Sequence, residues 1–184
     1  MGAEDKYIQK GMDDRGLLEH IAMFIPGYHG YRERNIRRDV DQLIRKNVSM
    51  ILKLGIKDLE WAYRETVNYG PSARVEELNR VTMKTDKISQ QIYHAKAGYS
   101  GIWQGLKVKE GELSELLRFD AGLIDLANKV KESTAKVRDH SKKHEFDLMF
   151  GLVDQYDIDL DEMATLIAQR DEVILGLGQD GGAQ

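Results

Sequence analysis

Two histidines one helical turn apart are the first residues in this sequence that could do chemistry. His140 and His144 stand at positions i and i+4, where two imidazoles on one helix can bind a shared metal ion. Lys142 and Lys143 lie between them, no glutamate follows His140 as in a zinc protease, and no third ligand is apparent. We therefore expect an exposed polar helix face here and predict no metal site.

Alternating aspartates near the C-terminus resemble the start of a calcium-binding loop. Asp157, Asp159 and Asp161 have the spacing of the first three ligands of such a loop. The sixth position is Glu162 rather than glycine and the twelfth is Ala168 rather than glutamate, so the EF-hand interpretation fails. Asp159 and Glu162 fit better as a capping box that begins a last helix.

Asp120 is the most informative single residue of the sequence. The hydrophobic periodicity places this carboxylate between Leu116 and Leu123 on an apolar seam, where an unpaired charge would cost several kcal/mol. We therefore predict a partner for Asp120, either Arg37 or Arg38 from an earlier helix or backbone amides of a loop. A buried polar contact that fixes helix register is the favoured role, and a ligand-binding carboxylate is the alternative.

The most basic window of the chain follows a glycine turn and contains Arg32, Arg34, Arg37, Arg38, Arg45 and Lys46. Such a window could bind phosphate or lie on anionic lipid, the more so because an apolar segment at residues 17–25 directly precedes it. Glu33, Asp39 and Asp41 lie in the same window and favour a solvated, salt-bridged face. Both interpretations stay open.

Glycines and large apolar residues alternate between residues 98 and 109. Glycine allows backbone conformations with positive φ, while Tyr99 and Trp103 need a place to be buried. We predict an ordered loop that packs over the end of a helical bundle, with Trp103 as its anchor. A second G-Y-x-G sequence at residues 27–30 precedes Tyr31 and could contact the first. The candidate binding residues are Tyr28, Tyr31, Arg34, Arg37, Arg38, Tyr99, Trp103 and Asp120.

Three long segments with helical periodicity must position these residues, at about 32–69, 72–97 and 111–150. In the first, the predicted core stripe is Ile36, Val40, Leu43, Asn47, Met50 and Leu54, widened by Ile44, Val48 and Ile51. In the second it runs Leu78, Val81, Thr85, Ile88, Ile92, Ala95 and Tyr99, and in the third Leu113, Leu116, Asp120, Leu123, Ala127, Val130, Thr134, Val137 and Ser141. Gly70-Pro71-Ser72 is a helix stop and restart, with Ser72 as a possible cap, and it implies an antiparallel hairpin. Shorter helices are expected before Pro26 and from Asp159 to about 176.

The composition limits the class of protein. A chain of 184 residues with two prolines and 32% charged residues fits one all-α domain, which we place at residues 13–176 between flexible segments 1–12 and 177–184. Without cysteine there are no disulfides. A net charge of −4 gives no case for nucleic acid. No long apolar segment or basic leader is visible, so we expect a cytoplasmic protein.

The turn Ile25-Pro26-Gly27-Tyr28-His29-Gly30-Tyr31, the pair Arg37-Arg38 and the later Gly98-Tyr99-Ser100-Gly101 loop before Phe119-Asp120 occur together in this chain. This combination resembles a group of short prokaryotic helical proteins that share an I-P-G-Y-x-G-Y turn, a di-arginine and a G-Y-x-G loop. The resemblance covers residues from about 14 to 130. It implies a shared helical architecture and transfers no activity.

These observations predict an all-α antiparallel bundle that acts as a non-enzymatic scaffold or protein-interaction module and self-associates. We predict no catalytic residue and no cofactor, because no G-x-x-x-x-G-K or G-x-S-x-G motif occurs. The polar second half of the third helix and the apolar residues 148–153 are the expected contact surfaces. The alternative is a peripheral membrane or anionic-ligand binder that uses residues 17–25 and 32–46. An enzyme with a pocket between the G-Y-x-G loops and Asp120 is a third, less favoured hypothesis.

Overall fold

A computed structural model of the chain describes residues 16–17, 19–21, 23–24, 34–95 and 110–179. These residues are helical apart from short turns, with no strand among them, so the predicted all-α class is confirmed. The chain forms two compact units. Unit 1 comprises residues 1–44, 96–124 and 167–184, and unit 2 comprises residues 45–95 and 125–166.

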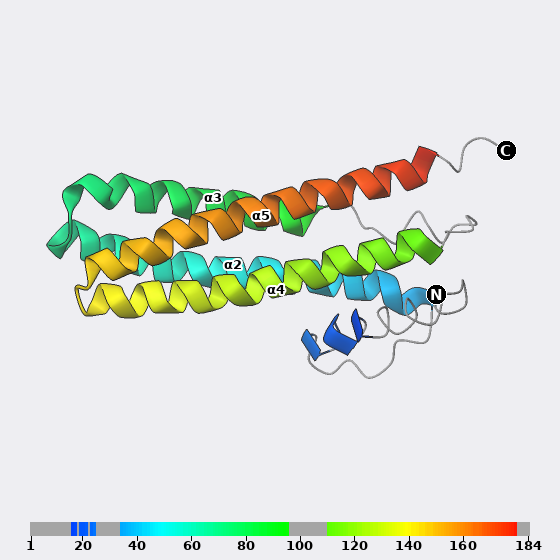
Figure 1. The fold of residues 1–184 in the computed structure, drawn as a ribbon, viewed down its shortest axis with the longest axis horizontal. Coiled ribbons are helices and arrows are strands. Elements are labelled where there is room, and N and C mark those ends of the chain that lie inside the picture. Colours follow the sequence, from blue (N-terminus) through cyan, green and yellow to red (C-terminus); the bar gives the residue numbers. More distant parts are fainter. Residues whose placement is uncertain (1–15, 18, 22, 25–33, 96–109, 180–184) are drawn as a thin grey trace, which may run out of the picture. The chain divides into compact units, whose positions relative to one another are not determined.

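Four long helices account for most of the described residues (Figure 1). They are α2 (Arg34–Tyr69), α3 (Val75–His94), α4 (Glu110–Lys142) and α5 (Phe146–Gln179), with a short 3-10 helix at Ser72–Arg74. The first three confirm the long helices predicted from periodicity. Unit 2 contains α3 and parts of α2, α4 and α5, whereas unit 1 contains the remaining parts of those three helices.

The turn between α2 and α3 in unit 2 depends on Gly70. A Cβ at this position would lie 2.9 Å from the Thr66 backbone and 2.9 Å from the Phe146 ring, so only glycine fits without displacement. Pro71 follows, and Ser72 begins the 3-10 helix instead of capping α3. The acidic first turn of α3, with Glu76 and Glu77, is as predicted and favours the helix N-terminus electrostatically.

The turn between α4 and α5 lies at the same end of unit 2 (Figure 1) and corrects the predicted 111–150 helix. His144 adopts a left-handed φ of 57°, and the amide of Glu145 donates to the His140 carbonyl at 3.0 Å. This is a Schellman-type helix end, which a non-glycine residue can form and which periodicity alone does not reveal. The chain then re-enters a helix at Phe146.

The predicted short C-terminal helix is also wrong in its start, because α5 is continuous from Phe146. Asp159 lies in the middle of α5 and is buried, so it does not cap a helix. Its Oδ1 accepts hydrogen bonds from Gln155 Nε2 at 3.3 Å and from Lys129 Nζ at 3.4 Å. These donors compensate the buried carboxylate.

The core of unit 2 follows the predicted seams of α3 and α4. Buried residues include Leu78, Val81, Thr85, Ile88 and Ile92 from α3 and Ala127, Val130, Thr134, Val137 and Ser141 from α4. The polar members have local partners: the Thr134 hydroxyl donates to the Val130 carbonyl at 3.0 Å, and the Ser141 hydroxyl donates to Arg138 at 2.7 Å. The seam of this half of α4 therefore lies in the core of unit 2 rather than in a contact surface, whereas Lys131, Glu132 and Lys136 on its other side are exposed.

The apolar residues at 148–153 are mostly internal as well. Met149, Phe150 and Val153 are buried in unit 2, and only Leu148 is strongly exposed, at 60%. They begin a regular core stripe of α5 that continues with Tyr156, Leu160 and Met163. This second expected contact surface is therefore also corrected.

The predicted core stripe of α2 faces outward where its side chains are described. Leu43, Met50 and Leu54 are exposed, whereas the residues we expected only to widen the stripe, Ile44 and Val48, are fully buried. In unit 2 the buried face of α2 continues with Leu52, Gly55, Leu59, Ala62 and Thr66. Gly55 allows a close approach to α4, since a Cβ there would lie 3.1 Å from the Thr134 methyl group.

Unit 1 has a core with both apolar and charged residues. Ile21 from the N-terminal helical residues is buried, as are Ile44, Leu116, Leu123 and Ile124. The predicted single domain at 13–176 and the predicted flexible ends stay predictions. No helix within the described residues is long and apolar enough to span a membrane.

Candidate functional site: the outer face of α2

Asp120 lies in a buried charge cluster of unit 1, as its place on the seam of α4 predicted. Arg170 Nε is 3.3 Å from Asp120 Oδ1, and Arg170 Nη2 donates to Asp41 Oδ1. The side chains of Arg170 and Asp120 are each 2% exposed and that of Asp41 is fully buried. Arg170 of α5 thereby links Asp41 of α2 with Asp120 of α4.

The burial of this cluster supports a structural role for Asp120. A guanidinium between carboxylates stabilises charges that would be costly alone, and it fixes the register of the three helices within unit 1. Arg170 lies in α5, and we did not predict it as a partner of Asp120 because a sequence pattern does not say which helices meet. Asp41 was assigned to the solvated arginine-rich window and is instead buried.

A row of ion pairs joins α3 and α5 in unit 2, which we call the α3–α5 ladder. Arg74 Nη2 is 2.8 Å from Asp154 Oδ1, Arg80 Nη2 is 2.7 Å from Asp157 Oδ2, and Lys84 Nζ is 2.6 Å from Asp157 Oδ1 and 2.7 Å from Asp161 Oδ1. Partial burial by itself would raise the pKa of Asp157. The hydrogen bonds from Arg80 and Lys84 outweigh it and hold this pKa below its ordinary value of 3.8.

The two histidines of the predicted polar face contact different carboxylates and do not converge. His140 Nδ1 is 2.6 Å from Glu145 Oε2, and His144 Nε2 is 3.2 Å from Glu65 Oε2. The His144 ring stacks on Tyr69, with centroids 4.6 Å apart. Within the part of the chain that the structure describes, no group of three or more ligating side chains could hold a metal ion.

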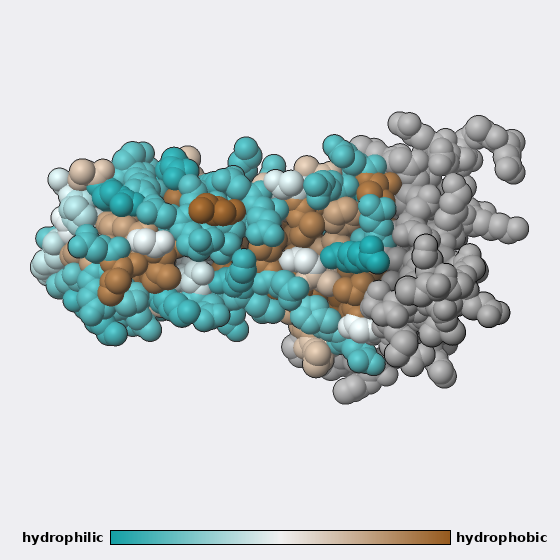
Figure 2. Space-filling model, viewed as in Figure 1, coloured by the Kyte–Doolittle hydropathy of each residue, from teal (hydrophilic) through white to brown (hydrophobic). Residues whose placement is uncertain are grey.

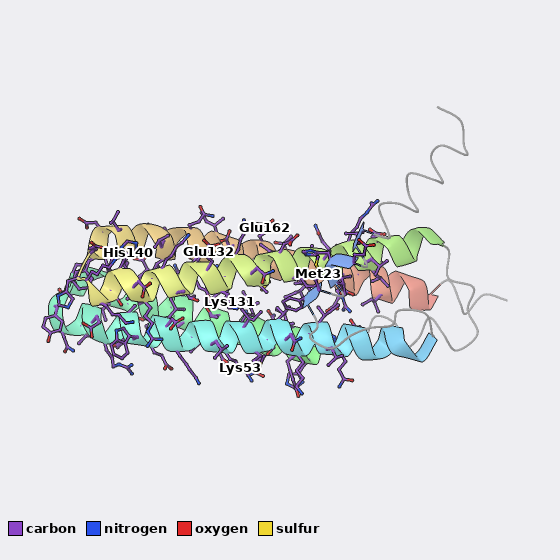
Figure 3. The ribbon with its side chains drawn as sticks, turned by 90° about the horizontal axis from the view of Figure 1, so that it is seen from below. Met23, Lys53, Lys131, Glu132, His140 and Glu162 are labelled. Atoms are coloured by element: carbon purple, nitrogen blue, oxygen red, sulfur yellow. The ribbon has the colours of Figure 1, made fainter. Side chains whose placement is uncertain are left out.

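The exposed side of α2 in unit 2 carries apolar side chains that do not belong to the core. We define the outer face of α2 as Lys46, Met50, Lys53, Leu54, Lys57, Glu60 and Trp61. Met50 is 54% exposed and Leu54 is 51% exposed, and Trp61 is half-buried. Figure 3 shows Lys53 on the side of α2 that points away from α4. Figure 2 shows that in the view of Figure 1 the described surface is mainly hydrophilic, with apolar side chains between the hydrophilic ones.

The side chains of this face have few polar partners. Within the described residues no ion pair or hydrogen bond involves Lys46, Lys57 or Glu60, although all three are exposed. Lys53 lies over the Tyr93 ring of α3, with Nζ 5.8 Å from the centroid. The Trp61 ring has Arg64 at 5.5 Å and Arg138 at 5.3 Å, which hold it by cation-π contacts. The face is thus a stripe of apolar side chains between charges that have no partner in unit 2.

Most other candidate binding residues are not described. Tyr28, Tyr31, Tyr99 and Trp103 lie outside the described residues, as does the predicted contact between the two G-Y-x-G loops. Arg34, Arg37 and Arg38 lie in the first turns of α2, where the backbone is described and the side chains are not. Their predicted roles stay predictions.

Comparison of the chain with protein-family models, with curated proteins and with solved structures finds no match. The geometry of the described residues is therefore the basis for assigning a function.

Proposed function

We propose that this protein is a non-enzymatic helical interaction module that binds other proteins through the outer face of α2. The observation that carries the proposal is that α2 in unit 2 has apolar side chains on two faces, one buried and one exposed. Its buried face supplies Leu52, Leu59 and Ala62 to the core, while Met50 and Leu54 repeat the helical spacing on the exposed face. A helix that is apolar on a second side is typical of one that packs against a further surface.

The composition of the outer face favours protein over lipid as its partner. A surface for anionic lipid needs an excess of cations beside its apolar residues. Here Glu60 shares the face with Lys46, Lys53 and Lys57, and the apolar centre is limited to Met50, Leu54 and the half-buried Trp61. Mixed charge around an apolar centre, with an aromatic residue and an arginine nearby, is instead typical of a protein-binding surface.

A photoreactive amino acid placed at Leu54 in the full chain, expressed in its native host, tests the proposal. We expect a discrete protein adduct on irradiation, since the probe lies within the contact. The control places the same amino acid at Lys136, which is exposed on α4 and already paired with Glu132. Adducts that contain only lipid, or equal labelling from both positions, would overturn the proposal.

A further inference from the structure

The acids of α2 in unit 2 are mostly paired within the chain. Asp58 Oδ1 accepts a hydrogen bond from Arg138 Nη1 at 3.0 Å, and Glu65 Oε2 is 3.2 Å from His144 Nε2. Both partners lie in α4 or in the turn that follows it. Glu60 remains as the acid of the outer face of α2. The charge of this face is therefore set mainly by its cations.

The cations of α2 in unit 2 form one row, which we call the cation row and define as Lys46, Lys53, Lys57 and Arg64. All four are exposed, and none forms an ion pair with any described residue. Because an α-helix turns by about 100° per residue, the four lie within about 40° of one another around the axis and span about 27 Å along it. The apolar residues of the outer face form a second row beside them. A partner that covers this face must meet both rows.

Two members of the cation row are positioned by aromatic rings. Lys53 Nζ is 5.8 Å from the centroid of the Tyr93 ring, and the guanidinium of Arg64 is 5.5 Å from that of the Trp61 ring. A ring orients a cation without neutralising its charge. A cation held in this way loses less side-chain entropy when a carboxylate binds to it. The row therefore favours a partner that presents anionic groups at regular intervals along α2.

We infer that the outer face of α2 binds an acidic amphipathic helix of another protein. Carboxylates of that helix lie along the cation row, and its apolar side chains cover Met50 and Leu54. This inference rests on the proposed function, since it names the partner of the same surface. The cations follow one another at intervals of seven, four and seven residues, which also repeat along one side of a partner helix. These intervals read the same in both directions, so a parallel and an antiparallel helix match the row equally.

A second copy of this chain and an anionic bilayer fit the face less well. A two-fold contact between copies brings the same face against itself, so the two cation rows would share one seam and repel each other. A bilayer can meet the cations, but helices that lie in its interface carry a broad apolar face. The apolar row here consists of Met50, Leu54 and the half-buried Trp61. An acidic helix matches the charge and the narrow apolar row together.

Isothermal titration calorimetry of the purified full chain with two synthetic peptides tests the chemistry of the partner. Each peptide is a helix of about 22 residues, long enough to span the cation row. Both carry the same leucines on one side. Beside these leucines the first peptide carries glutamates and the second carries lysines, each at intervals of seven, four and seven residues. We expect only the glutamate peptide to bind, with a dissociation constant that rises about tenfold between low and high salt because exposed charge pairs are screened.

Charge reversal tests whether the cation row is the binding surface. The double variant Lys53→Glu/Lys57→Glu should bind the glutamate peptide at least about tenfold more weakly and should gain binding of the lysine peptide, because attraction and repulsion are exchanged. Lys87→Glu/Lys143→Glu is the matched control, since it makes the same change of net charge at exposed lysines outside α2. It should leave binding of both peptides unchanged. Circular dichroism checks that each variant keeps its helix content.

The outcomes separate this inference from the function on which it rests. Equal binding of both peptides, failure of the glutamate peptide to bind, or equal loss in the row variant and the control overturns the acidic helix. Phosphatidylserine vesicles that bind the wild type and not the row variant, without binding of the glutamate peptide, would assign the row to lipid. Dimers of the purified chain that the row variant abolishes would assign it to a second copy. Each result overturns this inference, whereas a protein adduct from the Leu54 probe would still support the interaction module.

Discussion

The α3–α5 ladder and the outer face of α2 are both charged surfaces of unit 2, but they differ in whether their charged side chains form ion pairs. In the ladder, Asp157 and Asp161 contact cations from α3, and Asp154 contacts Arg74 at the end of the preceding 3-10 helix. On the outer face of α2, Lys46, Lys57 and Glu60 make no ion pair with any described residue, and the apolar side chains between them are exposed. The aspartates of the ladder have their ion-pair partners within unit 2, whereas Lys46, Lys57 and Glu60 have none among the described residues.

This difference shows how a charged helix face can be classified without a known relative. Counting charges does not separate the two surfaces, because both mix lysine or arginine with aspartate or glutamate. What separates them is whether the opposite charge is reached from a neighbouring helix of the same unit. Substitutions in the ladder should therefore change the free energy of unfolding, and substitutions on the outer face should change association.

The largest expected effect measures how much the buried contact of Arg170 with Asp41 and Asp120 contributes to the free energy of unfolding. Arg170→Ala should lower the free energy of unfolding by about 3–5 kcal/mol, because Asp41 and Asp120 lose a buried cation. Urea denaturation followed by circular dichroism measures the loss. Arg118→Ala removes an exposed arginine of the same helical bundle and is the control. A loss as small as that of the control would show that Arg170 does not neutralise the cluster.

The next effect compares the two sides of α2 directly. Leu59→Ala should lower the free energy of unfolding by about 2–5 kcal/mol, since the leucine is fully buried and its truncation leaves a cavity. Leu54→Ala should change stability by less than about 0.5 kcal/mol, because the leucine is half exposed. The same urea experiment serves for both, and Leu54→Ala alone should weaken association. Equal costs would mean that Leu54 belongs to the core.

The smallest effect concerns the centre of the ladder. Asp157→Asn should lower stability at neutral pH by about 1 kcal/mol, because Arg80 and Lys84 lose a partly buried anion. The pKa of Asp157 is lowered on folding, so its contribution is present above the ordinary value of 3.8 and is lost as the pH falls through the folded-state pKa. Wild type and variant should converge in acid. A difference that persists at pH 2 would exclude this carboxylate as its cause.

Much of the fold was predictable because helical periodicity is a local property. The seam of α3 was correct from Leu78 to Ile92 and that of α4 from Leu116 to Ser141, and Asp120 was correctly expected to be buried with a charged partner. Arg170 was not among the partners we predicted for Asp120, because it is fifty residues away and the contact depends on which helices pack together. The end of α4 was missed because His144 adopts a positive φ without glycine.

The candidate site shows where periodicity becomes ambiguous. In α2 two stripes satisfy the same spacing: the outer one includes Leu43, Met50 and Leu54, and the inner one includes Ile44, Val48, Leu52 and Leu59. The inner one also includes Gly55, Ala62 and Thr66, which look less like a core but allow close packing. The predicted stripe, chosen by regular four- and three-residue spacing alone, therefore took Leu43, Met50 and Leu54 from the outer side. That same error locates the surface to which we assign function.

The fluorescence of Trp61 can report binding at the outer face of α2. The sequence has two tryptophans, and Trp61 is the one that borders the outer face of α2. A protein that covers this face would exclude water from the exposed part of the indole and shift its fluorescence emission to shorter wavelength. With Trp103 replaced by phenylalanine, occupancy of the face can be followed in solution without any attached dye.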